Sequence, residues 1–159
     1  VLFRSFFNAS SGTPITTYAY TTDRIPMRVN GRGDLGRTPV FSQTDLLVAH
    51  TLNLTEGKKL RFELNMTNLF NQKTARYQQN IVTRYRDSSS GIDMSKVNLL
   101  NGFDWRALLA QTPYAKDKTR SSDPTSLDPA KNWAVDPTYG KNDVFNDGLA
   151  ARLMVKFVF

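Results

Sequence analysis

Hydrophobic and polar residues alternate with a period of two along several stretches of this chain, which is the pattern of half-buried β-strands. The C-terminal stretch is the clearest. Ala151, Leu153, Val155, Phe157 and Phe159 fall on one face of a strand, and the other face carries Arg152, Met154, Lys156 and Val158. We therefore predict a strand near 148–159 with one apolar face.

Two further stretches predict a hairpin. Val40–Leu54 places Leu46, Val48, His50, Leu52 and Leu54 on one face. Lys59–Phe70 returns with Leu60, Phe62, Leu64 and Met66 on one face and with Arg61, Glu63, Asn65 and Thr67 on the other. The turn Thr55–Lys58 contains Gly57, which can take the positive φ that a tight turn requires. The predicted strands lie near 40–54 and 59–71.

The N-terminal region predicts a weaker strand near 6–20, where Ile15, Thr17 and Ala19 alternate with polar and aromatic residues. Pro14 lacks a backbone donor and should lie at an edge or a bulge. Val1–Ser5 matches one reading frame of a common short-read sequencing adapter. We interpret residues 1–5 as an assembly artefact preceding an incomplete chain, and 6–159 as the biological segment.

Two polar segments separate these strands. Residues 21–39 are glycine-rich and charged, and residues 72–147 contain several prolines and many charges, so both are predicted to be loops. Short helices are plausible within the second, at 94–100 and 103–111. A loop as long as 72–147 argues against a compact soluble domain, whereas outer-membrane barrels combine long extracellular loops with short periplasmic turns.

The predicted fold class is all-β: an open antiparallel sheet of about four long strands, with both long loops at one end and the turn at the other. Alternation fits a soluble β-sandwich as well as a barrel. Runs of roughly ten residues favour tilted membrane strands over the soluble average of about five or six. In a barrel the apolar face would contact lipid, and the lumen-facing side chains would be Arg61, Glu63, Asn65, Arg152 and Lys156.

Composition narrows the possible chemistry. The 159 residues include no cysteine and one histidine, and the net charge is +7. Disulfides, thiolate metal sites and thiol nucleophiles are thereby excluded. We find no nucleophile–base pair and no metal cluster, so we predict no catalytic residue, no metal and no cofactor. The arginines Arg76, Arg84 and Arg86 interleave with Tyr77 and Tyr85, as in some nucleic-acid surfaces. We favour a solvated loop beside lipid A phosphates, with no nucleic-acid partner.

Two motifs in the loops have competing interpretations. Arg32-Gly33-Asp34 matches an adhesion tripeptide, and we favour a chance match in a Gly/Asp-rich turn. The loop aromatics are candidates for stacking on a sugar or peptide ligand, or else for packing a small core of the loop itself. This possible ligand-screening set is Trp105, Tyr114, Trp133 and Tyr139.

Several segments together resemble one family. Asn68-Leu69-Phe70-Asn71 ends a strand as in the penultimate strand of TonB-dependent outer-membrane receptors. Leu153, Val155, Phe157 and the terminal Phe159 resemble the outer-membrane assembly signal of that class. The segments GRGDLGRTPVFSQTDLLVAHTLNL, SSGIDMSKVNLLNGFDWRALL and DPTYGKNDVFNDGLAARLMVKFVF resemble the C-terminal portion of Oar-like receptors, which carry a carboxypeptidase-regulatory-like N-terminal domain. The likeness covers nearly the whole chain after Ser5.

This resemblance implies a barrel of about 22 strands with a plug in its lumen, of which the chain is the C-terminal part. It implies the bacterial outer membrane, energised uptake of a large or scarce ligand, and no enzymatic activity. The implied partners are outer-membrane lipid and lipopolysaccharide, the barrel assembly machinery, and TonB through a missing N-terminal part; the ligand is unknown. Two alternatives stay open. A passive porin-like or structural barrel would lack an upstream plug and TonB box, and an adhesive β-sandwich would be soluble alone.

Overall fold

The computed structural model describes residues 1–95 and 97–159. These residues form two compact units. Unit 1 comprises Val1–Thr13, Pro39–Tyr77 and Val144–Phe159, and unit 2 comprises Pro14–Thr38 and Gln78–Asp143. Each unit is therefore assembled from segments that lie far apart in the sequence.

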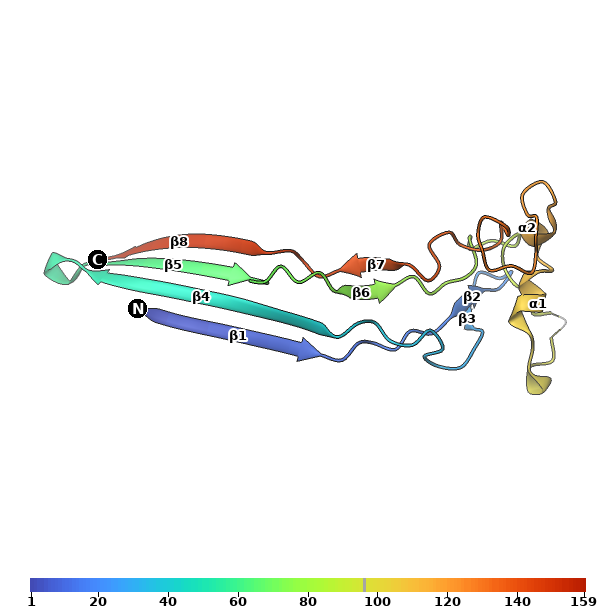
Figure 1. Cartoon of the computed structure of the whole chain (residues 1–159), viewed down its shortest axis with the longest axis horizontal. Helices are drawn as coiled ribbons and strands as arrows, with labels where there is room; N and C mark the ends of the chain where they lie inside the picture. The colour runs from blue at the N-terminus through green and yellow to red at the C-terminus, as the bar shows by residue number, and fades with distance from the viewer. Residues whose placement is uncertain (96) are drawn as a thin grey trace. The chain divides into compact units, whose positions relative to one another are not determined.

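Unit 1 is built on a four-stranded antiparallel sheet in the order β1-β4-β5-β8 (Figure 1). Its strands are β1 (Leu2–Ser10), β4 (Phe41–Asn53), β5 (Lys59–Thr67) and β8 (Ala150–Val158). Within the described residues β1 and β8 each pair on one side only, so the sheet is open rather than closed. The predicted all-β class and open antiparallel sheet are confirmed.

The β4–β5 hairpin closes through the short helix η1 (Thr55–Gly57). Gly57 has φ 78°, as the turn requires, and the Leu54 N–H donates to the Lys58 carbonyl at 2.8 Å. The connections after β1 and after β5 both leave the sheet at the end opposite η1, because all strand pairs are antiparallel. Both long connections are therefore at one end of the sheet and the short turn at the other, as predicted.

The first strand lies earlier than the predicted 6–20. Residues Leu2–Ser10 pair with Phe41–Ala49, so part of the suspected artefact belongs to the sheet. Pro14, which cannot donate to a ladder, makes only an isolated bridge with Arg37. Beyond it, Ile15, Thr17 and Ala19 are buried in unit 2. Their alternation reflects burial in a different unit and not a continuation of β1.

Unit 2 contains most of the two segments, 21–39 and 72–147, that are predicted to be loops. It contains the paired strands β2 (Tyr18–Tyr20) and β3 (Pro26–Arg28), the short helix η2 (Leu99–Asn101), and the helices α1 (Trp105–Leu109) and α2 (Pro113–Lys116). A further two-stranded sheet pairs β6 (Ala75–Gln78) with β7 (Asn142–Phe145). The long segment thus contains short helices and strands joined by irregular stretches.

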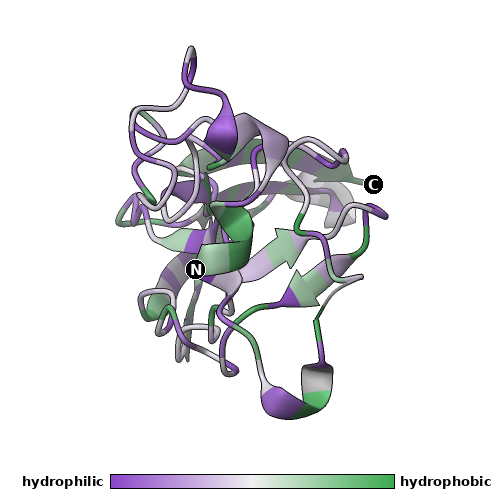
Figure 2. Cartoon of the chain, turned by 90° about the vertical axis from the view of Figure 1, so that its right-hand side faces the viewer, coloured by the Kyte–Doolittle hydropathy of each residue, from purple (hydrophilic) through white to green (hydrophobic). Residues whose placement is uncertain are grey.

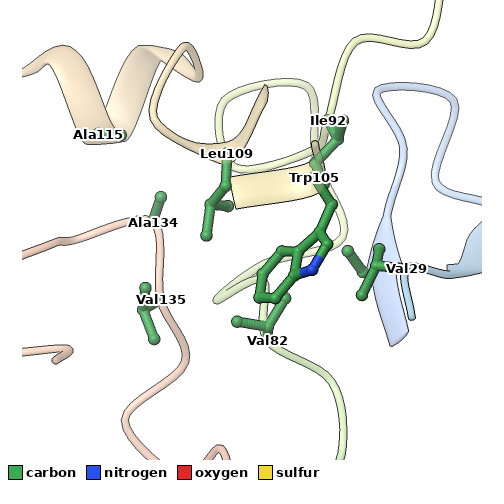
Figure 3. Close-up of a cluster of buried hydrophobic side chains, with 9 residues drawn as sticks. Val29, Val82, Ile92, Trp105, Leu109, Ala115, Ala134 and Val135 are labelled. Carbon is green, nitrogen blue, oxygen red and sulfur yellow. The ribbon is translucent and has the colours of Figure 1, made fainter. Parts of the chain in front are cut away.

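A small hydrophobic core holds unit 2 together (Figure 3). Trp105 lies between Val29, Val82 and Ile92. The same core also contains Leu109, Val135, Ala19, Ala115 and Ala134. These side chains come from both sequence segments of the unit. Burying an aromatic ring and several branched side chains supplies the stabilisation that its short elements lack.

The predicted helix at 103–111 is confirmed in a shorter form. Asp104 caps α1 by accepting from the Arg106 and Ala107 N–H groups at 2.9 and 3.3 Å. The helix predicted at 94–100 contains residue 96, which lies outside the described residues; near it the structure has only η2. In the described ranges neither helix is long and apolar enough to cross a membrane.

Candidate functional site

The two faces of the four-stranded sheet differ sharply in chemistry. Register places Leu153 opposite Leu64, Leu64 opposite Val48, and Val48 opposite Phe3, so each strand contributes to one apolar face. The side chains of this face on β8 are exposed, with Leu153 at 70%, Val155 at 54% and Phe157 at 51%, whereas Leu64 and Val48 on the central strands are half-buried. Figure 2 colours the chain by hydropathy and shows hydrophobic and hydrophilic residues interspersed along its loops and short elements. An exposed apolar face of this extent requires a nonpolar environment or a partner.

Residues assigned to the assembly signal belong to this face. Leu153, Val155 and Phe157 lie on β8 opposite Leu64, Phe62 and Leu60. Phe159 follows the strand and is exposed, with its ring centroid 5.8 Å from that of Phe157. His50, which interrupts the apolar row opposite Phe62, is exposed as well.

The opposite face carries the charged side chains. Arg61 pairs in register with Lys156, and Asn65 with Arg152. The carboxylate of Glu63 accepts from Arg61 Nε at 2.5 Å and lies 3.9 Å from Lys156 Nζ. The structure therefore brings together all five predicted polar side chains on two adjacent strands. Arg4 on β1 lies in the same row as Asn65 and Arg152, and it was missed because residues 1–5 were set aside.

The Asn68–Asn71 motif forms a turn that ends β5 and fixes the return of the chain. Asn68 is 2% exposed and takes the left-handed conformation, φ 51°, which asparagine tolerates better than most residues. Its Nδ2 donates to the Gln72 and Asp147 carbonyls at 3.0 and 2.6 Å, and its Oδ1 accepts from the Gln72 N–H at 2.8 Å. The Asn68 N–H in turn donates to Asp45 Oδ1 at 2.9 Å. β5 therefore ends at Thr67 and not at the predicted residue 71.

Asn71 and Asn146 extend this network to the start of β8. Asn71 also has positive φ, 50°, and its Oδ1 accepts from the Leu149 N–H at 3.1 Å. Asn146 donates to the Gln72 carbonyl and accepts from the Thr74 N–H at 2.5 Å. Leu69 donates its N–H to the Thr44 carbonyl, while Phe70 is exposed. The polar residues of the motif thus have a structural role, which is to connect three segments of unit 1.

Three of the four aromatic residues predicted to screen ligands, Trp105, Tyr114 and Tyr139, pack in or against the core of unit 2. Trp105 is 5% exposed and its Nε1 donates to Asn30 Oδ1 at 2.9 Å. Tyr114 and Tyr139 are half-buried against the same core. Trp133 lies beneath Arg84, with the guanidinium 3.8 Å from the ring centroid. The alternative weighed from the sequence, a small core of the loop itself, is the one observed.

The interleaved arginines also have partners within the chain. Arg84 Nε donates to the Trp133 carbonyl at 2.7 Å. Arg86 lies over Tyr20 at 4.6 Å and Arg76 over Phe41 at 5.2 Å from the ring centroids. Cation–π stacking accounts for these residues without a ligand.

The Arg32–Asp34 tripeptide lies in a turn tied to residues 16 and 17. Asp34 accepts from the Thr17 N–H at 2.7 Å and the Thr17 hydroxyl at 2.5 Å, and from Asn30 Nδ2 at 2.8 Å. Desolvation by partial burial raises the pKa of Asp34, but the hydrogen bonds from Thr17 and Asn30 outweigh it and lower the pKa below 3.8. Both carboxylate oxygens are engaged, which disfavours adhesion through this aspartate.

This geometry predicts an acid-sensitive unit 2. A carboxylate whose pKa is depressed in the folded state stabilises at pH values above its unfolded pKa, and this contribution is lost as pH falls through the folded value. Wild type should therefore lose thermal stability more steeply below about pH 4 than Asp34→Asn. Tryptophan fluorescence measures this, since both tryptophans lie in unit 2. Thr17→Val, which removes the donor hydroxyl, should shift the profile toward that of Asp34→Asn. Superimposable profiles for all three proteins would contradict the assignment.

Among the residues that the structure describes, no group of three or more His, Cys, Asp or Glu side chains could hold a metal ion. Comparisons with models of known protein families, with curated proteins and with solved structures find no match to this chain.

Proposed function

We propose that this chain forms the C-terminal strands of a TonB-dependent, Oar-like outer-membrane receptor that takes up a large or scarce ligand. The observation that carries the proposal is the sheet with one exposed apolar face and one charged face, on strands of nine to thirteen residues. A tilted membrane strand needs about 9–11 residues. Lipid would cover the apolar face, and the charged face would line a polar lumen.

The open edges of the sheet support the same proposal. Unpaired strand edges cannot be left within a bilayer, because their N–H and C=O groups would lack partners. β1 and β8 would therefore pair with further strands, as the resemblance to 22-stranded receptors implies. Lipopolysaccharide, the barrel assembly machinery and TonB are the partners that follow from this proposal.

Labelling of variants with a single introduced cysteine tests the proposal, because the chain has no native cysteine that could react. In a Gram-negative host, Ser122→Cys in unit 2 should react with a membrane-impermeant maleimide on intact cells. Lys58→Cys in the β4–β5 turn should react only after the outer membrane is opened. Leu153→Cys should resist the water-soluble reagent and react with a lipid-soluble one, whereas Arg152→Cys should show the opposite preference.

Equal labelling of Ser122→Cys and Lys58→Cys on intact cells would contradict the topology. Equal reactivity of the two neighbouring β8 cysteines toward both reagents would contradict the two-faced membrane sheet. The cysteine-free parent protein is the control for nonspecific labelling.

A further inference from the structure

A cleft of about 450 Å³ opens in unit 2, and all of its lining residues belong to that unit. Buried and half-buried residues form its floor, namely Gly91, Leu108, Thr112 and Thr22. Its exposed rim carries Ser88, Asp93, Gln111, Pro113 and Lys116. Clefts of this size accommodate small organic ligands, and an apolar floor with a few polar groups is typical of such sites.

The floor of the cleft depends on a glycine. A Cβ on Gly91 would lie 2.5 Å from the Thr21 carbonyl oxygen and 2.8 Å from that of Asp87. Thr112 is occupied in capping α2, since its Oγ1 accepts from the Ala115 N–H at 3.4 Å and donates to the Leu109 carbonyl at 2.8 Å. Among the residues that line the cleft, Leu108 and Pro113 provide the apolar surface that a ligand would contact.

Four polar side chains around the cleft have no hydrogen-bond or ion-pair partner among the residues that the structure describes. In the described ranges the side chains of Thr22, Ser88, Gln111 and Lys116 make no hydrogen bond, and Lys116 makes no ion pair. An ammonium group with nearby hydroxyl and amide donors is suited to a carboxylate. The rim also carries the Asp93 carboxylate, whose Oδ1 accepts from the Ser95 N–H at 2.9 Å. Its negative charge disfavours a multiply charged anion such as phosphate and favours a ligand that also bears an ammonium group.

We propose that this cleft binds a short zwitterionic peptide with apolar side chains. Lys116 holds its terminal carboxylate, Asp93 attracts its terminal ammonium group, and Leu108 and Pro113 contact its side chains. The inference uses residues of unit 2 alone and does not depend on the membrane assignment, which rests on unit 1.

Titration of the whole chain in detergent with the dipeptide leucyl-leucine, followed by calorimetry, tests the proposal. Saturable binding is expected, and Lys116→Gln should weaken it about tenfold or more because a charge-assisted hydrogen bond is lost. Lys116→Arg should retain most of the affinity. The matched control is Lys118→Gln, which removes an exposed lysine two positions away that does not line the cleft.

Modified probes distinguish the recognised groups. Leucyl-leucine amide lacks the terminal carboxylate and should bind the wild-type protein as weakly as the free dipeptide binds Lys116→Gln. The N-acetylated dipeptide lacks the terminal ammonium group and should also bind more weakly than the free dipeptide. The proposal would be overturned if the folded protein showed no saturable binding up to millimolar dipeptide, or if Lys116→Gln and Lys118→Gln had equal effects on binding. It would also be overturned if the amide bound as tightly as the free dipeptide, or if inorganic phosphate competed equally well. Tryptophan emission checks folding of each variant, since Trp105 lies in the core of the unit.

Discussion

On the strand proposed to face lipid, replacing Leu153 by arginine is expected to lower the partition of the chain into lipid vesicles by roughly 30- to 1000-fold, because an arginine facing lipid near the bilayer midplane costs about 2–4 kcal/mol. Leu153 lies midway along β8, and its neighbour across the sheet is Leu64. The side chain is 70% exposed, so in water an arginine there would meet no steric obstacle. Flotation of the chain with phospholipid vesicles measures the bound fraction.

Met154→Arg is the matched control, because Met154 is the next residue on the same strand and lies opposite Glu63 on the charged face. The same substitution at this position places a cation beside a carboxylate and should change partition by less than about threefold, as for a modest surface interaction. Similar losses for both variants would show that charge anywhere on β8 is disruptive. In that case lipid would not be the environment of the apolar face.

The sheet could be predicted from the sequence because strand faces follow a local rule. Side chains alternate at every second residue, and a register shift by one would exchange the faces, so the apolar pattern fixes the pairing. That is why Arg61, Glu63 and Lys156 were placed together correctly. The first strand was predicted too late in the chain because of the alternation of Ile15, Thr17 and Ala19. This alternation looks the same whether the residues lie in this sheet or in another core.

The residues that form the core of unit 2 could not be predicted, because its stability comes from contacts between distant segments. Val29 and Val135 meet Trp105 in one core, although no local period connects them. α2 did leave a signal that was missed. Thr112 followed by Pro113 is a helix start, with a capping hydroxyl and a proline whose missing N–H is not needed in the first turn.

The role of Asn68 could not be predicted from the sequence either, since its side chain donates a hydrogen bond to the carbonyl of Asp147, 79 residues away. Asn68→Ala is expected to lower the free energy of unfolding of unit 1 by about 3–5 kcal/mol, through buried groups left without hydrogen bonds and a left-handed conformation that alanine tolerates poorly. The groups left without a partner are the Gln72 N–H and the Asp147 carbonyl, whereas the Gln72 carbonyl keeps its hydrogen bond from Asn146. Urea unfolding of the detergent-solubilised chain measures the loss, with circular dichroism reporting the strands.

Asn71→Ala is the matched control, because Asn71 has nearly the same φ, 50°, but is exposed, and its side chain accepts a single hydrogen bond, from Leu149. Its loss should be about 1–2 kcal/mol. Asn68→Gly separates the two causes, since glycine restores the backbone freedom but not the hydrogen bonds. If the buried network dominates, Asn68→Gly should remain nearly as destabilised as Asn68→Ala. Recovery of Asn68→Gly to wild-type stability would instead make backbone conformation the reason for asparagine at this turn.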